Sequence, residues 1–376
     1  MPKKFELIKQ TKPIQLSLFE LLTETDVLTE DGDRQLKRGK NYSQTIELYD
    51  FMPRFVFGHQ ADLRKDYNGL LPALVRGFEC RGVPFKLTLT PATIVQPSGK
   101  SVGYYPGTDE DILEIVLRKM YLEDNPKLYD GQPGMTFTVN RIRKELKKQG
   151  RTRSHTQVIE SLLILKGSQI SCQNLETKTT MIFNPIDVLS FRKKDDADED
   201  TPCYLIFSNI VAEALNNLYF RRFNYKKVVS YKSVIARLLH RRISHHFTQS
   251  NPKLTYSVNF STLLRDFGLE YPTLAKAYIK LKEALKEMKD ANVIQEFVCE
   301  PIHNCKDARM IEDYFVKITP TQAFSFEVKN SNDIKTNISR ISEDSENIKQ
   351  SRNAKKSKKS TSFFPEPVKA KTAQDK

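Results

Sequence analysis

Two adjacent tyrosines, Tyr104 and Tyr105, are of a type that could form a covalent bond to DNA, because some nucleases nick DNA through a tyrosine phosphodiester. Such an enzyme also needs a metal ion held by two histidines that flank one hydrophobic residue, and no His-x-His occurs in this sequence. His245 and His246 are adjacent, so on a helix they point about 100° apart and are poorly placed to share one ion. We therefore expect the tyrosine pair to be packed aromatics rather than nucleophiles.

The segment PSGKS, from Pro97 to Ser101, resembles the end of a phosphate-binding loop. The complete pattern has a glycine five positions before Gly99, and this chain has Ile94 there. Pro97 also stiffens a loop whose backbone amides would have to converge on phosphate. We expect a turn at this place and no nucleotide hydrolysis.

The chain has 376 residues and a formal net charge of +14, from 60 Lys and Arg against 46 Asp and Glu. A field of this sign favours phosphate over an acidic protein or a neutral ligand, so it indicates a polyanionic partner. The position of the basic residues matters more than their number, because a run of charge is also typical of a solvated surface. A chain of this length is expected to form two or three domains, each with a core of its own.

The five cysteines are few, scattered and odd in number, as is typical of a reducing cytoplasm: Cys80, Cys172, Cys203, Cys299 and Cys305. Cys299, His303 and Cys305 match no common zinc spacing, and a fourth ligand is not evident. The opening MPKKFELIKQTK has no apolar core, and no run approaches the roughly 20 apolar residues of a membrane span. We expect a cytoplasmic protein with no membrane association, no metal, no cofactor and no catalytic residues.

One order of elements occurs twice along the chain, over 134–173 and over 254–300. Each copy begins with alternating residues that end in a Val-Asn pair. It continues with a short helix, a turn, a longer amphipathic helix and a β-branched run. This order is typical of a winged helix-turn-helix. We therefore predict an α+β fold with two tandem winged helix-turn-helix domains that bind double-stranded DNA.

Changes in composition predict the domain boundaries. Residues 192–202 read RKKDDADEDTP, and from residue 330 on Ser, Asn and Lys dominate. Charged residues over 25–41 predict a loop, and aromatic-rich segments at 45–58 and 78–95 predict short strands. The predicted domains are a small N-terminal strand-containing region (1–103), a first winged helix (104–192, the first unit), an acidic linker (193–202), a second winged helix (203–329, the second unit) and a disordered basic C-terminal tail (330–376).

The longer helix of the second unit has two distinct faces. An apolar stripe at alternating steps of four and three consists of Leu274, Tyr278, Leu281, Leu285 and Met288. The opposite side is polar and basic at first and acidic afterwards, with Thr273, Lys276, Lys280, Glu283 and Glu287. This gradient suits a helix that enters the major groove by its N-terminal end, although a surface helix of mixed charge has the same pattern. The predicted base contacts are Thr273, Lys276, Ala277 and Lys280.

The first unit repeats this pattern less cleanly. Its longer helix has a core stripe at Val158, Leu162 and Leu165, and its outward residues are Arg153, Thr156, Gln157 and Glu160. Secondary base or phosphate contacts are predicted from Arg151, Arg153, Thr156 and Gln157. The preceding helix presents basic residues that suit a helix crossing the phosphate backbone, namely Lys144, Lys147 and Lys148. A solvated basic face is the competing interpretation of that helix.

Three stretches resemble a known family, the bacterial plasmid replication initiators of the replication protein A type with tandem winged helices. They are YYPGTDEDILEIVLRKM (104–120), FTVNRIRKELKKQGRTRSHTQVIESLLIL (137–165), and the second unit with the preceding YKSVIARLLHRRISHHF (231–247). No single motif among them is diagnostic, because winged helices are common in transcription factors. The resemblance rests on the tandem arrangement at this length. The N-terminal region and the basic tail depart from the better-known members.

The resemblance implies binding to direct repeats at a plasmid replication origin, with the main major-groove contacts made by the C-terminal winged helix. It also implies opening of an AT-rich stretch and recruitment of the host replication initiator and helicase. The first winged helix would double as a dimer interface, giving a homodimer in equilibrium with the monomer. Such dimers repress their own promoter, which contributes to plasmid copy control.

Two other functions remain open from the sequence. One is a winged-helix transcriptional regulator, against which the lack of a visible ligand-sensing domain counts. The other is a nicking initiator that uses Tyr104 or Tyr105, and it predicts a covalent adduct with supercoiled origin DNA and divalent metal.

Overall fold

The computed structural model describes residues 24–28, 34–38, 42–57, 65–66, 71–96, 98–123, 127–129, 132–192, 201–216, 220–307 and 309–332. The chain divides into two compact parts, Met1–Asn332 and Asp333–Lys376, and the second lies outside the described residues. The predicted disordered tail (330–376) and acidic linker (193–202) therefore fall almost entirely outside them. Within the described ranges, no helix is both long and apolar enough to cross a membrane.

The N-terminal region differs from the sequence prediction in two places. Residues 25–41 were expected to form a loop, but β1 (Glu24–Leu28) and β2 (Arg34–Arg38) pair as antiparallel strands. The segment 45–58 was expected to be extended, but it contains the short helix α2 (Glu47–Phe51), which follows β3 (Tyr42–Ile46). β3 pairs with β15 (Phe220–Asn224), a strand almost 180 residues later in the chain, so tertiary pairing determines this segment.

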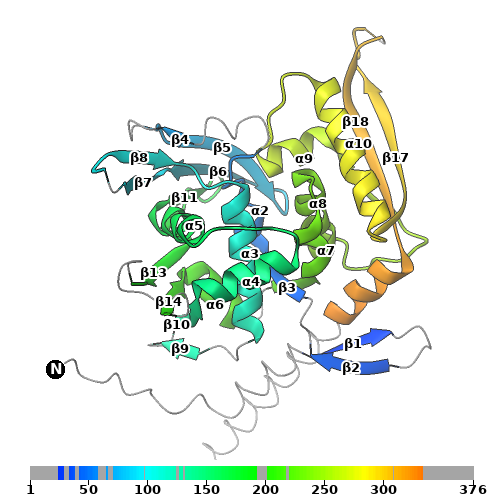
Figure 1. The fold of residues 1–376 in the computed structure, drawn as a ribbon. Helices are drawn as coiled ribbons and strands as arrows, with labels where there is room; N and C mark the ends of the chain where they lie inside the picture. Colours follow the sequence, from blue (N-terminus) through cyan, green and yellow to red (C-terminus); the bar gives the residue numbers. More distant parts are fainter. Residues whose placement is uncertain are drawn as a thin grey trace, which may run out of the picture. The chain divides into compact units, whose positions relative to one another are not determined.

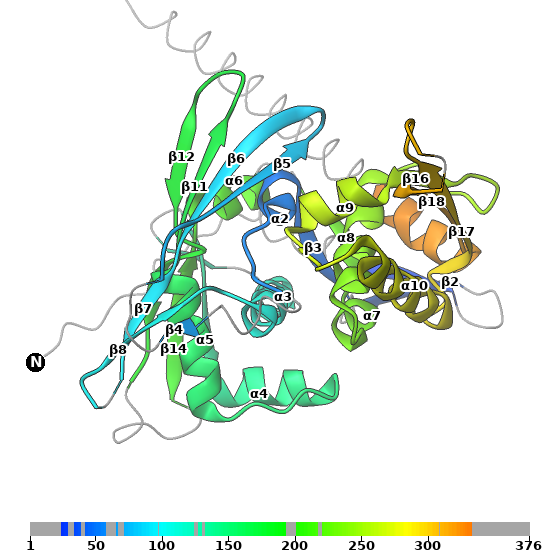
Figure 2. The ribbon, with the colours of Figure 1, turned by 90° about the horizontal axis from the view of Figure 1, so that it is seen from above.

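A four-stranded antiparallel sheet in the order β12-β11-β6-β5 forms the first layer. Its strands are β5 (Leu74–Cys80), β6 (Val83–Thr90), β11 (Gln169–Asn174) and β12 (Thr180–Phe183), and Figure 2 shows them side by side. The hairpin β11–β12 includes the β-branched run that the sequence analysis found after the longer helix of the first unit, and β11 pairs with β6 along its whole length. This sheet thus crosses the predicted boundary at residue 103. Its core includes Phe78, Leu87, Leu89, Ile170 and Cys172.

A small sheet joins the first layer to the helices. Its order is β4-β8-β7, and its strands are β4 (Lys65–Asp66), β7 (Ala92–Val95) and β8 (Ser101–Tyr104). The PSGKS segment lies at the connection of β7 to β8, where Gly99 has φ +79° and donates to the carbonyl of Gln96 (2.9 Å). The predicted turn is confirmed, since these amides close a hairpin rather than converge on a ligand.

The first unit contains the predicted helices α3 (Thr108–Glu123), α4 (Val139–Lys148) and α5 (His155–Gly167). A capping box at Ser154 and Gln157 starts α5, because each side chain accepts the backbone N–H of the other residue. The strand before α4 lies outside the sheet of the wing and belongs to a sheet in the order β13-β14-β10-β9. Its strands are β9 (Lys127–Tyr129), β10 (Gln132–Thr138), β13 (Ile186–Ser190) and β14 (Pro202–Phe207).

The second unit follows the predicted order of elements (Figure 1). Its leading helices are α6 (Asn209–Asn216), α7 (Tyr225–Ser230) and α8 (Val234–His246). They are followed by β16 (Tyr256–Asn259), α9 (Phe260–Phe267), α10 (Leu274–Asp290), β17 (Ile294–His303) and β18 (Ile311–Pro320). The three strands form an antiparallel sheet in the order β16-β18-β17, and a helical segment over 322–332 follows. An α+β fold with antiparallel sheets is confirmed.

Buried ion pairs join the two units at their leading helices. Asp111 of α3 lies 3.0 Å from Arg241 and 3.5 Å from Arg237, both on α8, and all three side chains are at most 6% exposed. Beside them, Arg118 of α3 binds Asp50 of α2 at 2.8 Å. Breaking a buried pair leaves an uncompensated charge, which costs about 3–5 kcal/mol. These carboxylates therefore fix α3 against α2 and α8.

Candidate nucleic-acid interface

The turn from α9 to α10 depends on a glycine in the left-handed conformation. Gly268 has φ +62°, its N–H donates to Arg265, and the N–H of Leu269 donates to Leu264. A Cβ at this position would lie 2.8 Å from Pro53 and 2.8 Å from the guanidinium of Arg76. Any side chain here would thus be strained and would push α9 away from the N-terminal region.

The helix α10 starts at a hydrogen-bonded cap and buries one face. The hydroxyl of Thr273 accepts the N–H of Lys276 (3.3 Å), so this predicted contact residue is the N-cap of α10. The buried face consists of Ala277, Leu281, Ala284, Leu285 and Met288, each at most 1% exposed. Leu274 and Tyr278, the other members of the predicted stripe, are half-buried.

The structure corrects the prediction for Ala277. This residue is 1% exposed and lies on the same face as Leu281 and Ala284, four and seven positions later. A side chain in the core cannot contact a base edge. The helical period already places Ala277 on the apolar side, because it lies four positions before Leu281.

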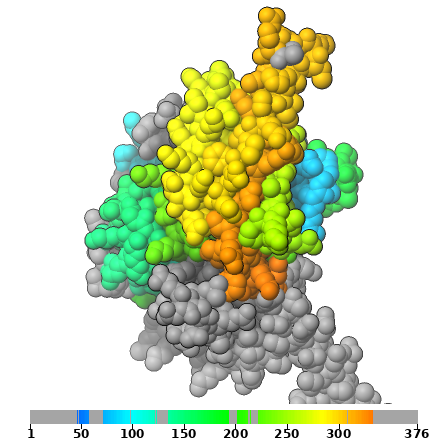
Figure 3. All heavy atoms as spheres, turned by 90° about the vertical axis from the view of Figure 1, so that its right-hand side faces the viewer, coloured from blue at the N-terminus to red at the C-terminus, as the bar shows by residue number. Residues whose placement is uncertain are grey.

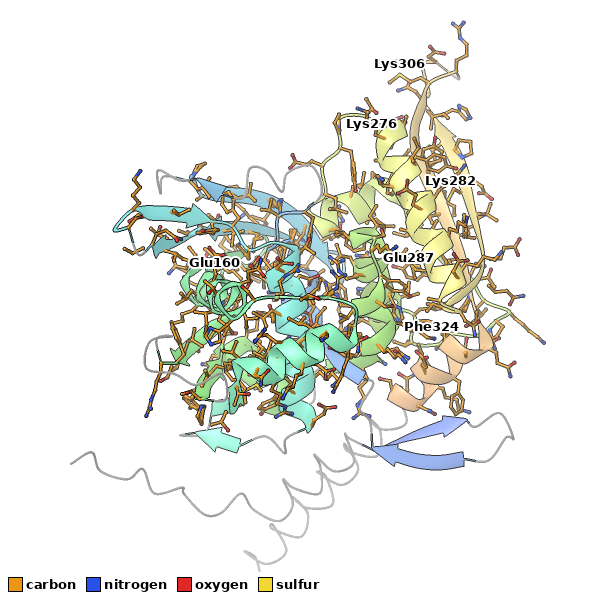
Figure 4. The ribbon with its side chains drawn as sticks, in the orientation of Figure 1. Glu160, Lys276, Lys282, Glu287, Lys306 and Phe324 are labelled. Atoms are coloured by element: carbon orange, nitrogen blue, oxygen red, sulfur yellow. The ribbon has the colours of Figure 1, made fainter. Side chains whose placement is uncertain are left out.

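Lys276 and Lys280 are exposed on the side of α10 that lines an open groove of about 830 Å³. The rest of the groove is formed by Lys232, Ser233, Val234, Ile235, Tyr271, Pro272, Ile279, Glu283 and Glu287. Figure 4 shows Lys276 near the start of α10. The ammonium of Lys280 lies 2.8 Å from the carboxylate of Glu283, with both side chains more than half exposed. An ion pair this exposed contributes little, so Lys280 can exchange it for a phosphate or a base edge at small cost.

The acidic end of α10 is used inside the second unit. The carboxylate of Glu287 accepts the backbone N–H of Lys232 (2.7 Å) and of Ser233 (3.0 Å), at the start of α8. Glu287, which the sequence placed on the outward side of α10, is therefore bound to the start of α8. The lysines in the first two turns of α10, Lys276 and Lys280, remain exposed and can bind a ligand.

The hairpin β17–β18 is fixed to α10 by an aromatic stack. The rings of Tyr278 and Tyr314 are 3.8 Å apart and parallel within 1°, and the ammonium of Lys282 lies 4.6 Å from the Tyr278 ring. β16 pairs only with residues 315–318, so the outer half of the hairpin projects as a two-stranded ribbon (Figure 3). Lys306 at its tip is exposed, at the same end of the picture as Lys276 (Figure 4).

The sequence prediction missed several exposed basic residues of this surface, namely Lys282, Lys286, Lys306 and Arg309. The first two lie on the other flank of α10, away from the side that was assigned as outward. The 10-residue strands and the polar tip between them were the available signal for the ribbon.

The predicted contact residues of the first unit have intramolecular partners. Arg151 is half-buried and donates to the carbonyls of Val229 (3.1 Å) and Tyr231 (2.9 Å), so its guanidinium joins the turn before α5 to the second unit. Arg153 is paired with Asp109. Thr156 is exposed, and Gln157 is exposed and engaged in the capping box of α5.

The preceding helix α4 carries the predicted basic face. Lys144, Lys147 and Lys148 are exposed, while Ile142 and Leu146 are buried. Lys148 lies 3.1 Å from Glu145, but the lysine side chain is 69% exposed. All three ammonium groups are thus accessible to a phosphate backbone.

Both tyrosines of the possible nucleophilic pair are packed in the core. Tyr104 is 2% exposed and donates to Glu160 (2.6 Å), and Tyr105 is 6% exposed and donates to the carbonyl of Pro72. Burial raises the pKa of Tyr105, which opposes formation of a phenolate. The packing interpretation is confirmed. The five cysteines are free thiols, and the described residues contain no cluster of three or more His, Cys, Asp or Glu suited to a metal ion.

No protein-family profile matches this sequence, and no curated protein matches it. The fold is similar to a solved structure of domains 2 and 3 of RctB, with a TM-score of 0.43 and 10% identity over 68% of this chain and 95% of that one. A second structure of RctB domains 2–3 has a TM-score of 0.42 and 9% identity over 69% and 94%. The Pi initiator protein in complex with iteron DNA has a TM-score of 0.38 and 14% identity over 56% and 91%.

The third of these neighbours is an initiator protein bound to iteron DNA. These scores describe a distant likeness. The functional assignment is therefore drawn from the residues of this chain.

Proposed function

We propose that this protein is a non-enzymatic replication initiator that binds direct repeats at a plasmid origin through two tandem winged helices. In the second unit, α8, α9 and α10 would be the three helices of the domain and β17–β18 its wing. The sheet order β16-β18-β17 supports this, because it places the first strand beside the last and leaves the hairpin free to project. α10 would be the recognition helix in the major groove.

The proposal rests mainly on the difference between the two ends of α10. Its first two turns expose Lys276 and Lys280 beside an open groove, and Glu287, in its fourth turn, is bound to the start of α8. A helix that reads base edges with its N-terminal end needs basic and polar groups there and no free carboxylate near the phosphates. Thr273 would donate or accept from the cap position, and Lys280 would release Glu283 on binding.

In the first unit, the proposed contacts are those of α4 and the start of α5. Lys144, Lys147 and Lys148 would bind phosphates, since all three are exposed on one helix. Arg153, Thr156 and Gln157 would contact the other end of the site. Arg151 is assigned to packing between the units instead, because two carbonyls of the second unit occupy its guanidinium.

The remaining parts of the proposal come from the family resemblance. They are opening of an AT-rich stretch, recruitment of the host initiator and helicase, and a homodimer in equilibrium with the monomer that represses its own promoter in copy control. A regulator of transcription alone would differ in one respect, because deletion of the gene would leave plasmid maintenance intact. Loss of the plasmid upon deletion would support the initiator.

The direct test is a pair of lysine substitutions. Lys276→Ala and Lys280→Ala should each cost about 1–3 kcal/mol on a cognate duplex selected from a random pool, and less on a scrambled duplex. Lys289→Ala is the matched control, because this exposed lysine lies in the last turn of α10. Gel-shift titrations of the unaltered protein and the three variants on both duplexes give eight affinities. Equal losses on both duplexes would mean that α10 does not read bases, and the proposed binding mode would be wrong.

A further inference from the structure

The centre of the outward face of α10 is occupied by an isoleucine. Ile279 is 56% exposed, although the opposite side of the same helix is packed into the core. At 100° per residue it points almost directly away from Leu281, Ala284 and Met288, which are buried. Ala275, one turn earlier on the same face, is also exposed. The centre of the outward face is therefore apolar in the first two turns of α10.

Four lysines surround this apolar centre. At the helical period, Lys276 and Lys280 lie on one flank of Ile279 and Lys282 lies on the other, while Lys286 follows almost in line with Ile279 two turns later. All four lysines are exposed. Glu283, the acidic residue one turn after Ile279, is paired with Lys280, and the exposed Asp290 lies on the same face three turns after Ile279. A single exposed aliphatic side chain is ordinary on a protein surface and by itself indicates nothing. An exposed aliphatic side chain surrounded by lysines indicates a partner that carries strong negative charge around one small apolar group.

Duplex DNA has this combination in the major groove. Phosphates border the groove on both sides, and the thymine C5-methyl is the apolar group that the base pairs present at its floor. We propose that Ile279 contacts the C5-methyl of one thymine and selects an A·T pair at that position. This assignment rests on the proposed function, because it requires α10 to enter the major groove.

The lysines around Ile279 favour DNA over a protein partner. An apolar protein surface would gain from Ile279 but would have to desolvate four ammonium groups without compensating charge. A duplex gives each of them a phosphate within reach, and released counterions add to the affinity. Ile279 also lines the groove together with Lys276 and Lys280, so one ligand can contact all three side chains.

Replacement of thymine by deoxyuridine tests the contact, because it removes the methyl and leaves every hydrogen-bonding group in place. The cognate duplex is made with one deoxyuridine at a time, and each duplex is titrated with the full chain. For the unaltered protein, one position should lose about threefold to tenfold in affinity, the scale of a buried methyl group. With Ile279→Ala the penalty at that position should fall below about twofold, whereas the other positions should not change.

Two further variants complete the experiment. Ile279→Val keeps a branched aliphatic side chain and should retain part of the penalty. Val188→Ala removes an exposed aliphatic side chain of β13 (42% exposed) and should leave the whole uracil profile unchanged. Thermal unfolding should be equal for all variants, since Ile279 is exposed.

The inference is overturned if Ile279→Ala shows the same uracil profile as the unaltered protein, or if the Val188→Ala control alters it equally. Such a result with the Lys276→Ala and Lys280→Ala effects intact would reject the thymine contact and keep the DNA-binding mode. Loss of sequence preference in the lysine experiment itself would reject the proposed function. An unchanged uracil profile together with loss of a protein–protein contact in Ile279→Ala would assign the residue to a protein partner, and would also overturn the inference.

Discussion

Glu287 accepts a hydrogen bond of 3.0 Å from the backbone N–H of Ser233, the residue that caps α8. Its second oxygen accepts the N–H of Lys232, so one carboxylate satisfies two amides at the positive end of a helix. The position of α10 against α8 depends on this contact. The same contact occupies both oxygens of Glu287, which lies in the lining of the groove beside Lys276 and Lys280.

Substitution of Glu287 should therefore destabilise the fold. Glu287→Ala leaves two N–H groups without their acceptor, and the free energy of unfolding should fall by about 1–2 kcal/mol. Urea unfolding measures this. Glu283→Ala is the matched control, because it removes only an exposed ion pair and should stay within about 0.5 kcal/mol. If the two variants unfold at the same urea concentration, Glu287 does not dock α10.

This prediction differs from what the sequence alone suggests. Helical periodicity places Glu287 on the side opposite Leu281 and Leu285, which is typical of a solvated residue whose loss changes little. Periodicity describes one helix and contains no information on which neighbour covers its flank. The partners of Glu287 lie 54 and 55 residues earlier in the chain, so only the tertiary structure shows them.

The same limit explains the errors in the N-terminal half. The helices α3, α4 and α5 were predictable, because their stripes and caps are local features. The sheet partners were not, since β6 pairs with β11 and β3 pairs with β15 across long sequence separations. The loop prediction for 25–41 relied on charge, which is also compatible with two paired strands.

The candidate contact residues also divide into those that the local helix pattern places correctly and those that it does not. Lys276 and Lys280 follow directly from the apolar stripe. Ala277 is not a contact residue, because it lies on the buried side of α10. Arg151 binds carbonyls of the other unit, which the sequence of its own unit does not show. The central outward position, Ile279, is 56% exposed, whereas an isoleucine in a helix is usually a core residue.

The basic tail should add affinity without specificity. The lysines from residue 353 on, which lie outside the described residues, are Lys355, Lys356, Lys358, Lys359, Lys369, Lys371 and Lys376. Each lysine that meets a phosphate releases a counterion, so removal of residues 353–376 should flatten the dependence of affinity on salt. The ratio of affinities for cognate and scrambled duplexes should stay the same. A tail that serves only solubility would leave the salt slope unchanged, and titrations from 50 to about 200 mM salt distinguish the two.

The buried histidine of α8 should make the fold sensitive to mild acid. His240 is fully buried, its Nδ1 lies 3.0 Å from the hydroxyl of Tyr231, and Phe324 packs edge-on against its ring. Burial, with a smaller contribution from the charge of Lys227, lowers its pKa from 6.5 to about 3. Between these two values the unfolded chain binds a proton that the folded chain does not. Stability is therefore unaffected by this group above about pH 6.5 and falls as the pH drops toward 3.

From pH 7 to pH 5 the contribution of His240 is on the order of 2 kcal/mol. His240→Gln keeps an acceptor for Tyr231 and does not titrate, so it should lose that much less stability over the same interval. The control is His303→Gln, which makes the same replacement at an exposed histidine of β17. Urea unfolding at the two pH values gives the difference for each protein. Equal losses in His240→Gln and the unaltered protein would mean that His240 already binds its proton in the folded state, and the buried neutral ring would be the wrong description.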